Sequence, residues 1–168
     1  MSSTPSPMND PACPPYACIF SYLGVAIALS FTSLGSAYGT FKSAIGLFKV
    51  CVDRPDMIFK GIMPVIMAGI VGIYGLVAAI IVSPTMDYPY PVYKGYANLA
   101  GGICVGLAGL ASGCAIGVAG EVSVSAMATH PELLMPSMLI LIFGEVLGLY
   151  GFIISIILGT KDAKCIPM

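Results

Sequence analysis

Charged residues are scarce in this sequence. Lys and Arg number 7, Asp and Glu number 8, and charged residues make up 9% of the 168 positions, against 58% hydrophobic residues. Soluble globular domains carry about 25% charged residues, so this composition excludes an ordinary water-soluble domain. The formal net charge of −1 is spread over loops and tails without a basic patch, so we expect no nucleic-acid partner.

The sequence also lacks the patterns of metal centres and of nucleotide-hydrolysing enzymes. Its 6 cysteines include no Cys-x-x-Cys pair, and there is only 1 histidine, so we expect no metal site and no cofactor. No glycine is followed directly by lysine, which excludes the P-loop that cradles phosphates. The chain is therefore not expected to be an enzyme by itself.

Long uncharged runs are the most prominent feature that is present. They cover residues 11–41, 61–86, 95–120 and, apart from Glu145, 133–160. Each run exceeds the roughly 20 residues that a helix needs to cross about 30 Å of hydrocarbon. Because backbone polar groups in lipid must bond within their own segment, each run is predicted to be a helix. The predicted fold is an all-α membrane protein with four transmembrane helices.

The expected segments follow from these runs. The flexible N-terminal tail is residues 1–15, the transmembrane helices are 16–39, 61–82, 96–127 and 133–158, the intervening loops are 40–60, 83–95 and 128–132, and the C-terminal tail is 159–168. The first loop is flanked by basic residues, namely Lys42, Lys49, Arg54 and Lys60. Positive charge favours the cytosolic side, so loops 40–60 and 128–132 are predicted to be cytosolic, whereas loop 83–95 and both termini are predicted to be lumenal or external.

The two halves of the chain are related by a duplication. The segment RPDMIFKGIMPVIMAGIVGIYGL returns as HPELLMPSMLILIFGEVLGLYGF, and GSAYG at 35–39 is taken to answer GCAIG at 113–117. Two hairpins that each cross the membrane twice share one orientation, so the sequence predicts a parallel repeat of helical hairpins. Parallel repeats of this kind are suited to the assembly of subunits into a ring.

Small residues are predicted to mark helix-packing faces. In the helix 96–127 they recur in steps of three and four and share one face, comprising Gly102, Gly106, Gly109, Gly113, Gly117 and Gly120. Faces of this kind let helix backbones approach closely in membranes. Packing within one four-helix bundle and packing between subunits both remain open, although stripes on all four helices favour an oligomer.

One carboxylate, Glu145, falls near the centre of the helix 133–158. Insertion scales charge about 2.5–3.5 kcal/mol for an ionised acid at that depth, so the group is expected to be protonated while it faces lipid. No Lys, Arg or His lies within the four apolar runs. A functional ionised state therefore requires a cation from another subunit. A structural, permanently hydrogen-bonded acid is the alternative.

The predicted surroundings of Glu145 are apolar. They comprise Met67, Gly69, Phe143, Gly144 and Leu147, with Tyr74 and Tyr150 about one turn beyond. Either tyrosine could offer a hydroxyl, although packing is the favoured role for both. Sodium needs several oxygen ligands, whereas a carboxyl alone holds a proton, so a proton is the predicted ion. Gly69 occupies the position aligned with Glu145 in the first hairpin, so only one hairpin carries the acid.

Four motifs resemble one known family across nearly the whole chain after residue 16. IMPVIMAGIVGIYGLV, LILIFGEVLGLYGFI, FTSLGSAYGT and GLAGLASGCAIGVAGE are similar to the 16 kDa proteolipid c subunits of the eukaryotic vacuolar-type proton-translocating ATPase. A single acid in the fourth helix fits the standard c type better than the c″ type.

This resemblance implies a proton-carrying subunit of a rotor ring. Glu145 would be the essential carrier and would meet an arginine of the stationary a subunit. The ring would turn with a central stalk and a d-type subunit on the cytosolic side. The resemblance also implies a vacuolar or other acidic endomembrane, with both termini in the lumen.

The sequence leaves two other functions open. A proton-coupled secondary transporter or channel also places acids at mid-membrane. A structural, pore-forming proteolipid would have a dispensable Glu145.

Overall fold

The computed structural model describes residues 14, 16–86 and 90–161. Within them every regular element is helical. The long helices are α1 (Ala17–Cys51), α3 (Met63–Val82), α4 (Val92–Thr129) and α5 (Leu134–Gly159), and the short α2 spans Ile58–Gly61. Single 3₁₀ turns at Pro55–Met57, Ser83–Thr85 and Pro131–Leu133 flank them. Each proline stands where its missing N–H has no helical partner to lose.

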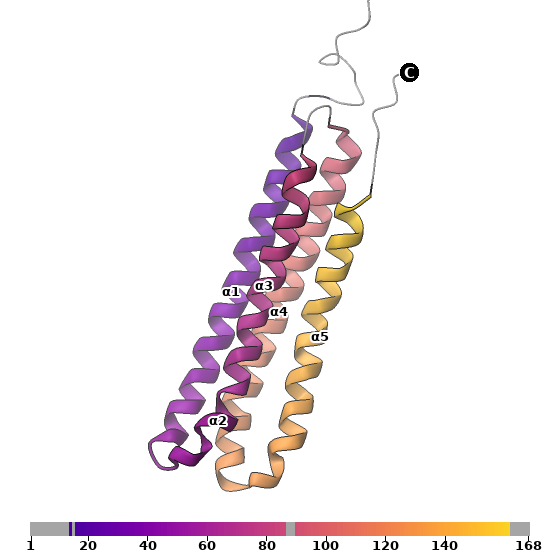
Figure 1. The fold of residues 1–168 in the computed structure, drawn as a ribbon. Coiled ribbons are helices and arrows are strands. Elements are labelled where there is room, and N and C mark those ends of the chain that lie inside the picture. The colour runs from indigo at the N-terminus through magenta and orange to yellow at the C-terminus, as the bar shows by residue number, and fades with distance from the viewer. Residues whose placement is uncertain (1–13, 15, 87–89, 162–168) are drawn as a thin grey trace, which may run out of the picture.

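Four helical segments are long and apolar enough to cross a membrane in the described part of the chain. They are Ala17–Cys51, Pro55–Val82, Val92–Thr129 and Pro131–Gly159, with 35, 28, 38 and 29 residues. This confirms the predicted four-helix membrane fold. The helices lie alongside one another in an elongated bundle, with the start of α1 and the end of α5 at the same end (Figure 1).

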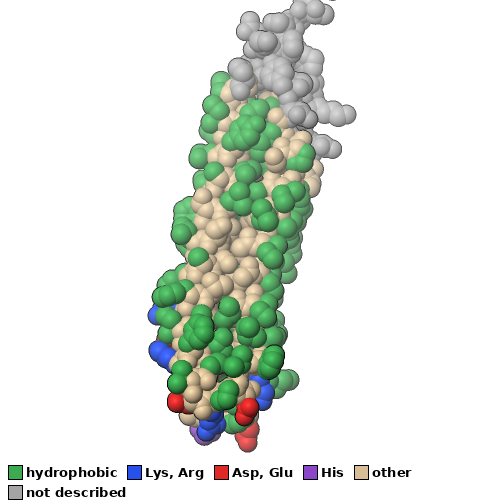
Figure 2. Space-filling model, turned by 60° about the vertical axis from the view of Figure 1, so that its left-hand side comes forward, with side chains coloured by type: hydrophobic (Ala, Val, Ile, Leu, Met, Phe, Trp, Pro, Cys, Tyr) green, Lys and Arg blue, Asp and Glu red, His purple; other side chains and the backbone are tan. Residues whose placement is uncertain are grey.

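The surface of the bundle matches a lipid environment. Many large hydrophobic side chains are exposed, such as Phe41 at 63%, Phe143 at 64% and Ile80 at 59%. On the face drawn in Figure 2, hydrophobic side chains extend along the molecule, and charged ones gather toward the end that holds the short loops. Water would penalise such a surface, whereas lipid tails solvate it.

The first helix is longer than the sequence predicted. The segment 40–60 was expected to be a loop, but α1 continues to Cys51 and α2 begins at Ile58. α4 is also longer at both ends than the expected 96–127. The helix does not stop where the apolar run stops, because Gly46 and Val50 of α1 remain packed against α4, and Lys42 and Lys49 form ion pairs with Glu121 beside this contact.

The closest contact in the bundle joins α1 to α4. A Cβ atom added at Gly35 would lie 2.6 Å from the Gly109 carbonyl oxygen, and one added at Gly113 would fall on the Gly35 backbone. Gly102, Gly106 and Gly117 also face backbone atoms of α1, whereas Gly109 and Gly120 face the side chains of Thr32 and Ser43. Only glycine permits this backbone approach. α3 then packs on α1, and α5 packs on α4.

The glycine stripe of α4 is therefore filled by α1 of the same chain. Of the two interpretations left open by the sequence, the intramolecular one holds for this face. Its glycines give no argument for an oligomer, and such an argument must rest on other surfaces.

The contacts also fix the register of the duplication. A Cβ at Gly72 would lie 3.1 Å from Ser36 Oγ, and a Cβ at Gly148 would lie 3.1 Å from Ser112 Oγ. Likewise Gly75 faces Ala28, and Gly151 faces Cys104. Equivalent positions are thus 76 residues apart in all four helices. The matching of GSAYG with GCAIG, 78 residues apart, was wrong. The glycines of GSAYG and GCAIG resemble each other because they meet across the α1–α4 contact. They do not occupy equivalent positions of the repeat.

Candidate ion-binding site

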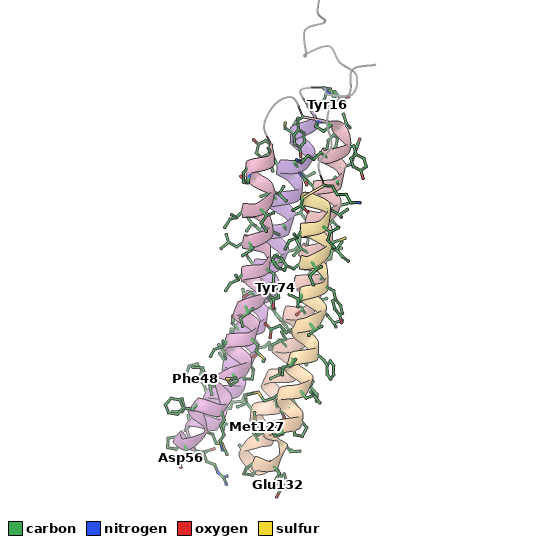
Figure 3. All side chains as sticks on the ribbon, turned by 45° about the vertical axis from the view of Figure 1, so that its right-hand side comes forward. Tyr16, Phe48, Asp56, Tyr74, Met127 and Glu132 are labelled. Atoms are coloured by element: carbon green, nitrogen blue, oxygen red, sulfur yellow. The ribbon has the colours of Figure 1, made fainter. Side chains whose placement is uncertain are left out.

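The carboxyl group of Glu145 lies roughly midway along α5 and is partly buried. Tyr74 of α3 donates a hydrogen bond from its hydroxyl to Glu145 Oε1 over 3.1 Å. Figure 3 places Tyr74 about midway along the bundle. The sequence favoured packing for Tyr74, with a hydroxyl contact as the lesser option, and the structure has this side chain in both roles.

Tyr74 is held in place by the ring of Phe152. The two rings are stacked with centroids 5.4 Å apart. Tyr74 also packs against a small core cluster of Ala28, Ala78 and Val105. Stacking and burial fix the ring plane, so the hydroxyl is aimed at the carboxyl without a large entropic cost.

The backbone beside the acid is tied to α4. Ser112 donates a hydrogen bond to the Gly144 carbonyl oxygen over 2.7 Å, and Ser112 is 1% exposed. The lack of a side chain at Gly148 permits this approach, since a Cβ there would lie 3.1 Å from Ser112 Oγ. The α5 backbone on either side of Glu145 is thereby kept against α4.

A shallow cavity of about 160 Å³ opens beside the carboxyl. It is lined by Tyr74, Ile142, Glu145, Val146 and Leu149. The hydroxyl and the carboxyl are the polar side-chain groups of this lining. A proton needs one oxygen, whereas a bare hard cation needs about six oxygen ligands, so the site can hold a proton but cannot replace a hydration shell.

The other predicted neighbours of Glu145 have different surroundings. Met67 packs against the buried cluster of Ala68, Val71, Ile116 and Leu141. Gly69 lies in a separate groove between α1 and α3. Gly144 faces Ile116, and a Cβ on it would lie 3.3 Å from the Ile116 side chain.

Three further predicted neighbours project outward from α5. Phe143, Leu147 and Tyr150 are 64%, 58% and 57% exposed. Sequence reasoning missed Ile142, Leu149 and Ser112. The first two lie three residues before and four after Glu145, and this helical spacing could have identified them. No local signal points to Ser112, because it contacts the site from another helix.

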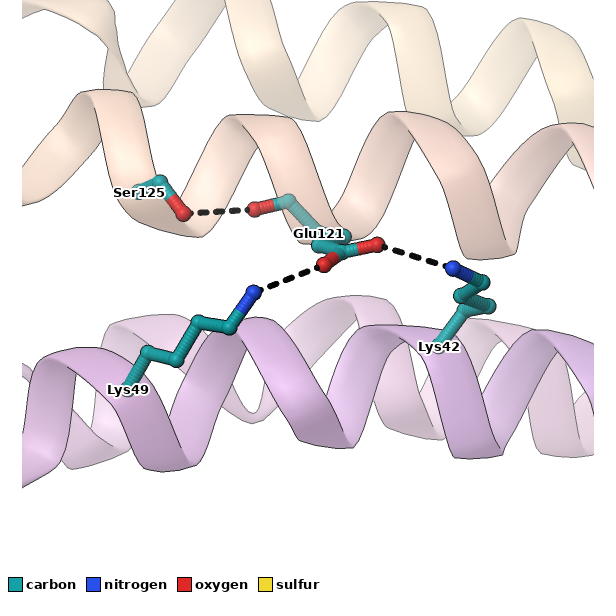
Figure 4. Close-up of polar contacts among 4 residues, drawn as sticks. All are labelled: Lys42, Lys49, Glu121 and Ser125. Carbon is teal, nitrogen blue, oxygen red and sulfur yellow. Dashed lines mark hydrogen bonds and ion pairs between the residues drawn. The ribbon is translucent and has the colours of Figure 1, made fainter.

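Lys42, Lys49 and Arg54 form their polar contacts away from Glu145. Lys42 Nζ and Lys49 Nζ lie 3.5 and 3.1 Å from the carboxylate oxygens of Glu121, as Figure 4 shows. Arg54 donates to the Ala128 carbonyl oxygen over 2.8 Å. In the part of the chain that the structure describes, no ion pair reaches Glu145.

Comparison with known proteins gives a consistent family. Residues 23–82 and 99–158 each match the family model that describes the C subunit of ATP synthase. The chain is 46% identical to the V-type proton ATPase 16 kDa proteolipid subunit of Chrysotila carterae, over 94% of this chain and 99% of that protein. It is 51% identical to one of the V-type proton ATPase 16 kDa proteolipid c subunits of Caenorhabditis elegans, over 87% of this chain and 92% of that protein. For the 16 kDa proteolipid c subunit of Ovis aries the identity is 47%, over 88% and 96%.

Proposed function

Because the chain belongs to the family of V-type proton ATPase proteolipid subunits, we propose that Glu145 carries the proton in this subunit. The protein is a multi-pass membrane subunit of the rotor ring and does not hydrolyse ATP itself. ATP-driven rotation in the complex is coupled through the ring to proton translocation.

One observation carries the assignment of Glu145. It is a carboxyl group midway along a membrane-crossing helix, with a single hydroxyl donor at 3.1 Å. An ionised acid at that depth is costly, and a protonated one is tolerated. Reversible protonation therefore separates a form that can travel past lipid from a form that cannot.

The proton cycle follows from this difference. While Glu145 faces lipid it keeps its proton, and Tyr74 holds the carboxyl through Oε1. When the ring brings it to a stationary subunit, the proton leaves to water, and the carboxylate needs a cation nearby. We propose an arginine of the stationary a subunit for this role. The support is that Lys42, Lys49 and Arg54 of this chain bond to Glu121 and Ala128, away from the site.

The proposed ion is a proton and not sodium. Ile142, Val146 and Leu149 offer no oxygen ligand from their side chains, and the cavity of about 160 Å³ has only one hydroxyl besides the carboxyl. A dehydrated sodium ion would be left with unfilled coordination positions.

The proposed orientation has both termini in the lumen of a vacuole or another acidic compartment. The support is that positive charge is retained on the cytosolic side, and the last turns of α1, the turn after it and α2 hold Lys42, Lys49, Arg54 and Lys60. That end of the bundle would then meet the central stalk and the d-type subunit.

The decisive variant is Glu145→Gln, which keeps the shape of the side chain and removes its titration. We expect ATP-driven acidification of vesicles to fall to background while the ring still assembles. Glu121→Gln is the matched control, since it removes an acid held by Lys42 and Lys49 at a solvated position. We expect this control to retain most of the acidification rate, because exposed ion pairs contribute only about 0–1 kcal/mol.

Two results would contradict the proposal. Undiminished acidification by an assembled Glu145→Gln ring would mean that the acid is structural. Proton flux through the purified chain without the ATPase would mean a channel or a secondary transporter.

A further inference from the structure

The first hairpin contains an open groove at the position where the second hairpin has its acid. The groove has a volume of about 400 Å³ and lies between α1 and α3. Its lining comprises Leu29, Ser33, Ser36, Ala37, Gly69, Gly72, Ile73 and Leu76. A Cβ atom added at Gly69 would meet nothing within 4 Å. Gly69 and Ile73 are equivalent to Glu145 and Leu149, which line the cavity beside the acid, so this groove includes the position of the missing carboxyl.

Two hydroxyl groups lie on the walls of this groove. Ser33 is exposed and Ser36 is half-buried. Neither hydroxyl has a hydrogen-bond partner among the described residues, whereas Ser112, the counterpart of Ser36, donates to the Gly144 carbonyl oxygen. Unpaired polar groups at this depth favour an occupant that brings its own donor or acceptor.

The duplication specifies which group that occupant brings. In the chain, Tyr74 of the first hairpin reaches Glu145 and stacks on Phe152 of the second hairpin. Shifting each residue by one repeat of 76 positions turns Tyr74 into Tyr150, Glu145 into Gly69 and Phe152 into Leu76. Tyr150 is 57% exposed, and Gly69 and Leu76 both line the groove.

We propose that the groove at Gly69 receives Tyr150 from a second copy of this chain. The ring of Tyr150 packs on Leu76 of the neighbour, and its hydroxyl reaches the space left by the missing carboxyl, beside Ser36. This contact repeats the packing of the first hairpin on the second. It is heterologous, so each copy uses its α4–α5 face on one side and its α1–α3 face on the other.

The inner helices agree with this arrangement. The same shift brings Ala111 and Ala115 of α4 against Ser33 and Ala37 of α1 in the next copy. All four residues are exposed in the single chain. They are small enough for close helix packing. Because they carry Cβ atoms where the α1–α4 contact has glycines, the spacing between copies is wider than the spacing within one chain.

This inference rests on the proposed function, because a closed ring is what makes every copy both donor and acceptor of Tyr150. It adds a role for the hairpin that lost its acid. A tyrosine in the vacated site excludes water from a position where the ring has no proton to carry.

Cross-linking in membranes that hold the assembled ATPase tests the contact. In a background with the 6 native cysteines replaced by alanine, Tyr150→Cys is combined with Leu76→Cys and treated with a short bifunctional thiol reagent. We expect a ladder of products that extends beyond the dimer, because each copy is linked to two neighbours. Tyr74→Cys with Phe152→Cys is the positive control. It is expected to link within one chain and to produce no ladder.

Two results would overturn the proposal. If the positive control reacts and the Tyr150–Leu76 pair gives no product between copies, lipid occupies the groove. If Tyr150→Cys alone yields a dimer as efficiently as the pair, the α4–α5 face of one copy packs against the α4–α5 face of a second copy, and not against its α1–α3 face.

The outcome separates this contact from the proposed function. Loss of acidification in Glu145→Gln together with an absent ladder would refute the interface and leave the proton carrier standing. A ladder together with undiminished acidification in Glu145→Gln would support the interface and refute the role of Glu145 as proton carrier.

Discussion

At the residue scale the proposed proton site consists of one carboxyl and one hydroxyl. The Tyr74 hydroxyl donates to Glu145 Oε1 over 3.1 Å. Stacking of Tyr74 on Phe152 fixes this hydroxyl, so the hydrogen bond can hold the carboxyl of Glu145 in one position for proton transfer.

Replacing Tyr74 by phenylalanine tests this contribution. One hydrogen bond contributes about 1 kcal/mol, which corresponds to about fivefold in a rate. We therefore expect ATP-driven proton uptake in Tyr74→Phe to be slower by up to about fivefold, with the ring still assembled. Tyr150→Phe is the control, because the hydroxyl that donates to Glu145 belongs to Tyr74, and its uptake rate should stay near that of the native chain. Equal rates for Tyr74→Phe and the native chain would show that the Tyr74 hydroxyl does not position the carboxyl for proton transfer.

How much of this site could be predicted differs from residue to residue. Glu145 could be identified from the sequence, because the free-energy cost of an ionised acid in hydrocarbon follows from its depth in the helix, and that depth can be read from the apolar run. Its hydroxyl partner could not be identified in this way. Tyr74 and Tyr150 occur in the same repeated motif, and only the packing of one hairpin on the other decides that Tyr74 reaches an acid and Tyr150 does not.

At the scale of elements, the central contact is the backbone approach of α1 to α4. Gly113→Ala would place a methyl group on the Gly35 backbone. We expect this variant to lose about 3 kcal/mol of folding free energy, as overpacked sites do, because backbone cannot move aside as a side chain can. An SDS titration of the purified chain, followed by circular dichroism, measures the change.

Gly69→Ala is the matched control for that prediction. A Cβ atom at Gly69 meets nothing within 4 Å, so we expect its folding free energy to change by less than about 1 kcal/mol. Equal losses in the two variants would contradict this role of the α1–α4 contact, because alanine favours the helix over glycine at both positions and propensity alone would stabilise both variants.

The helices themselves were largely predictable, and their register was not. Four apolar runs in a solvent without hydrogen bonds leave the chain little choice but helix. The C-terminal end of α1 could not be predicted from hydropathy, because the packing of Val50 and the ion pairs of Lys42 and Lys49 with Glu121 depend on α4 lying alongside. The glycine alignment failed for a similar reason. Glycines recur where two helices touch, and this recurrence imitates a sequence repeat.

At the scale of the whole molecule, the even number of crossings puts both ends of the bundle's chain on one side of the membrane, and the basic residues near the first short loop predict that this side is the lumen. Asp56 lies at the end with the short loops and Tyr16 at the opposite end (Figure 3). In a cysteine-free background and sealed vesicles with the cytosolic face outward, an impermeant maleimide should label Asp56→Cys directly. It should label Tyr16→Cys only after permeabilisation. The reverse pattern would place the termini in the cytosol.

The loss of one acid per chain affects the energetics of the ring. With a fixed number of hairpins, a ring with acids in every second hairpin moves half as many protons per turn. The free energy of rotation available to each proton is then doubled. Since each unit of pH difference costs about 1.4 kcal/mol per proton, such a ring is suited to building steep gradients.

The most direct test of the proton carrier is covalent labelling of Glu145 in the assembled ATPase. Hydrophobic carbodiimides react with protonated carboxyls in apolar surroundings, so the modified residue, mapped by mass spectrometry over a series of pH values, reports the protonated acid. We predict that the label lies on Glu145 and decreases as the pH rises. Labelling confined to loop acids such as Asp53, Asp56 and Glu132, with Glu145 unmodified at every pH, would contradict the central claim.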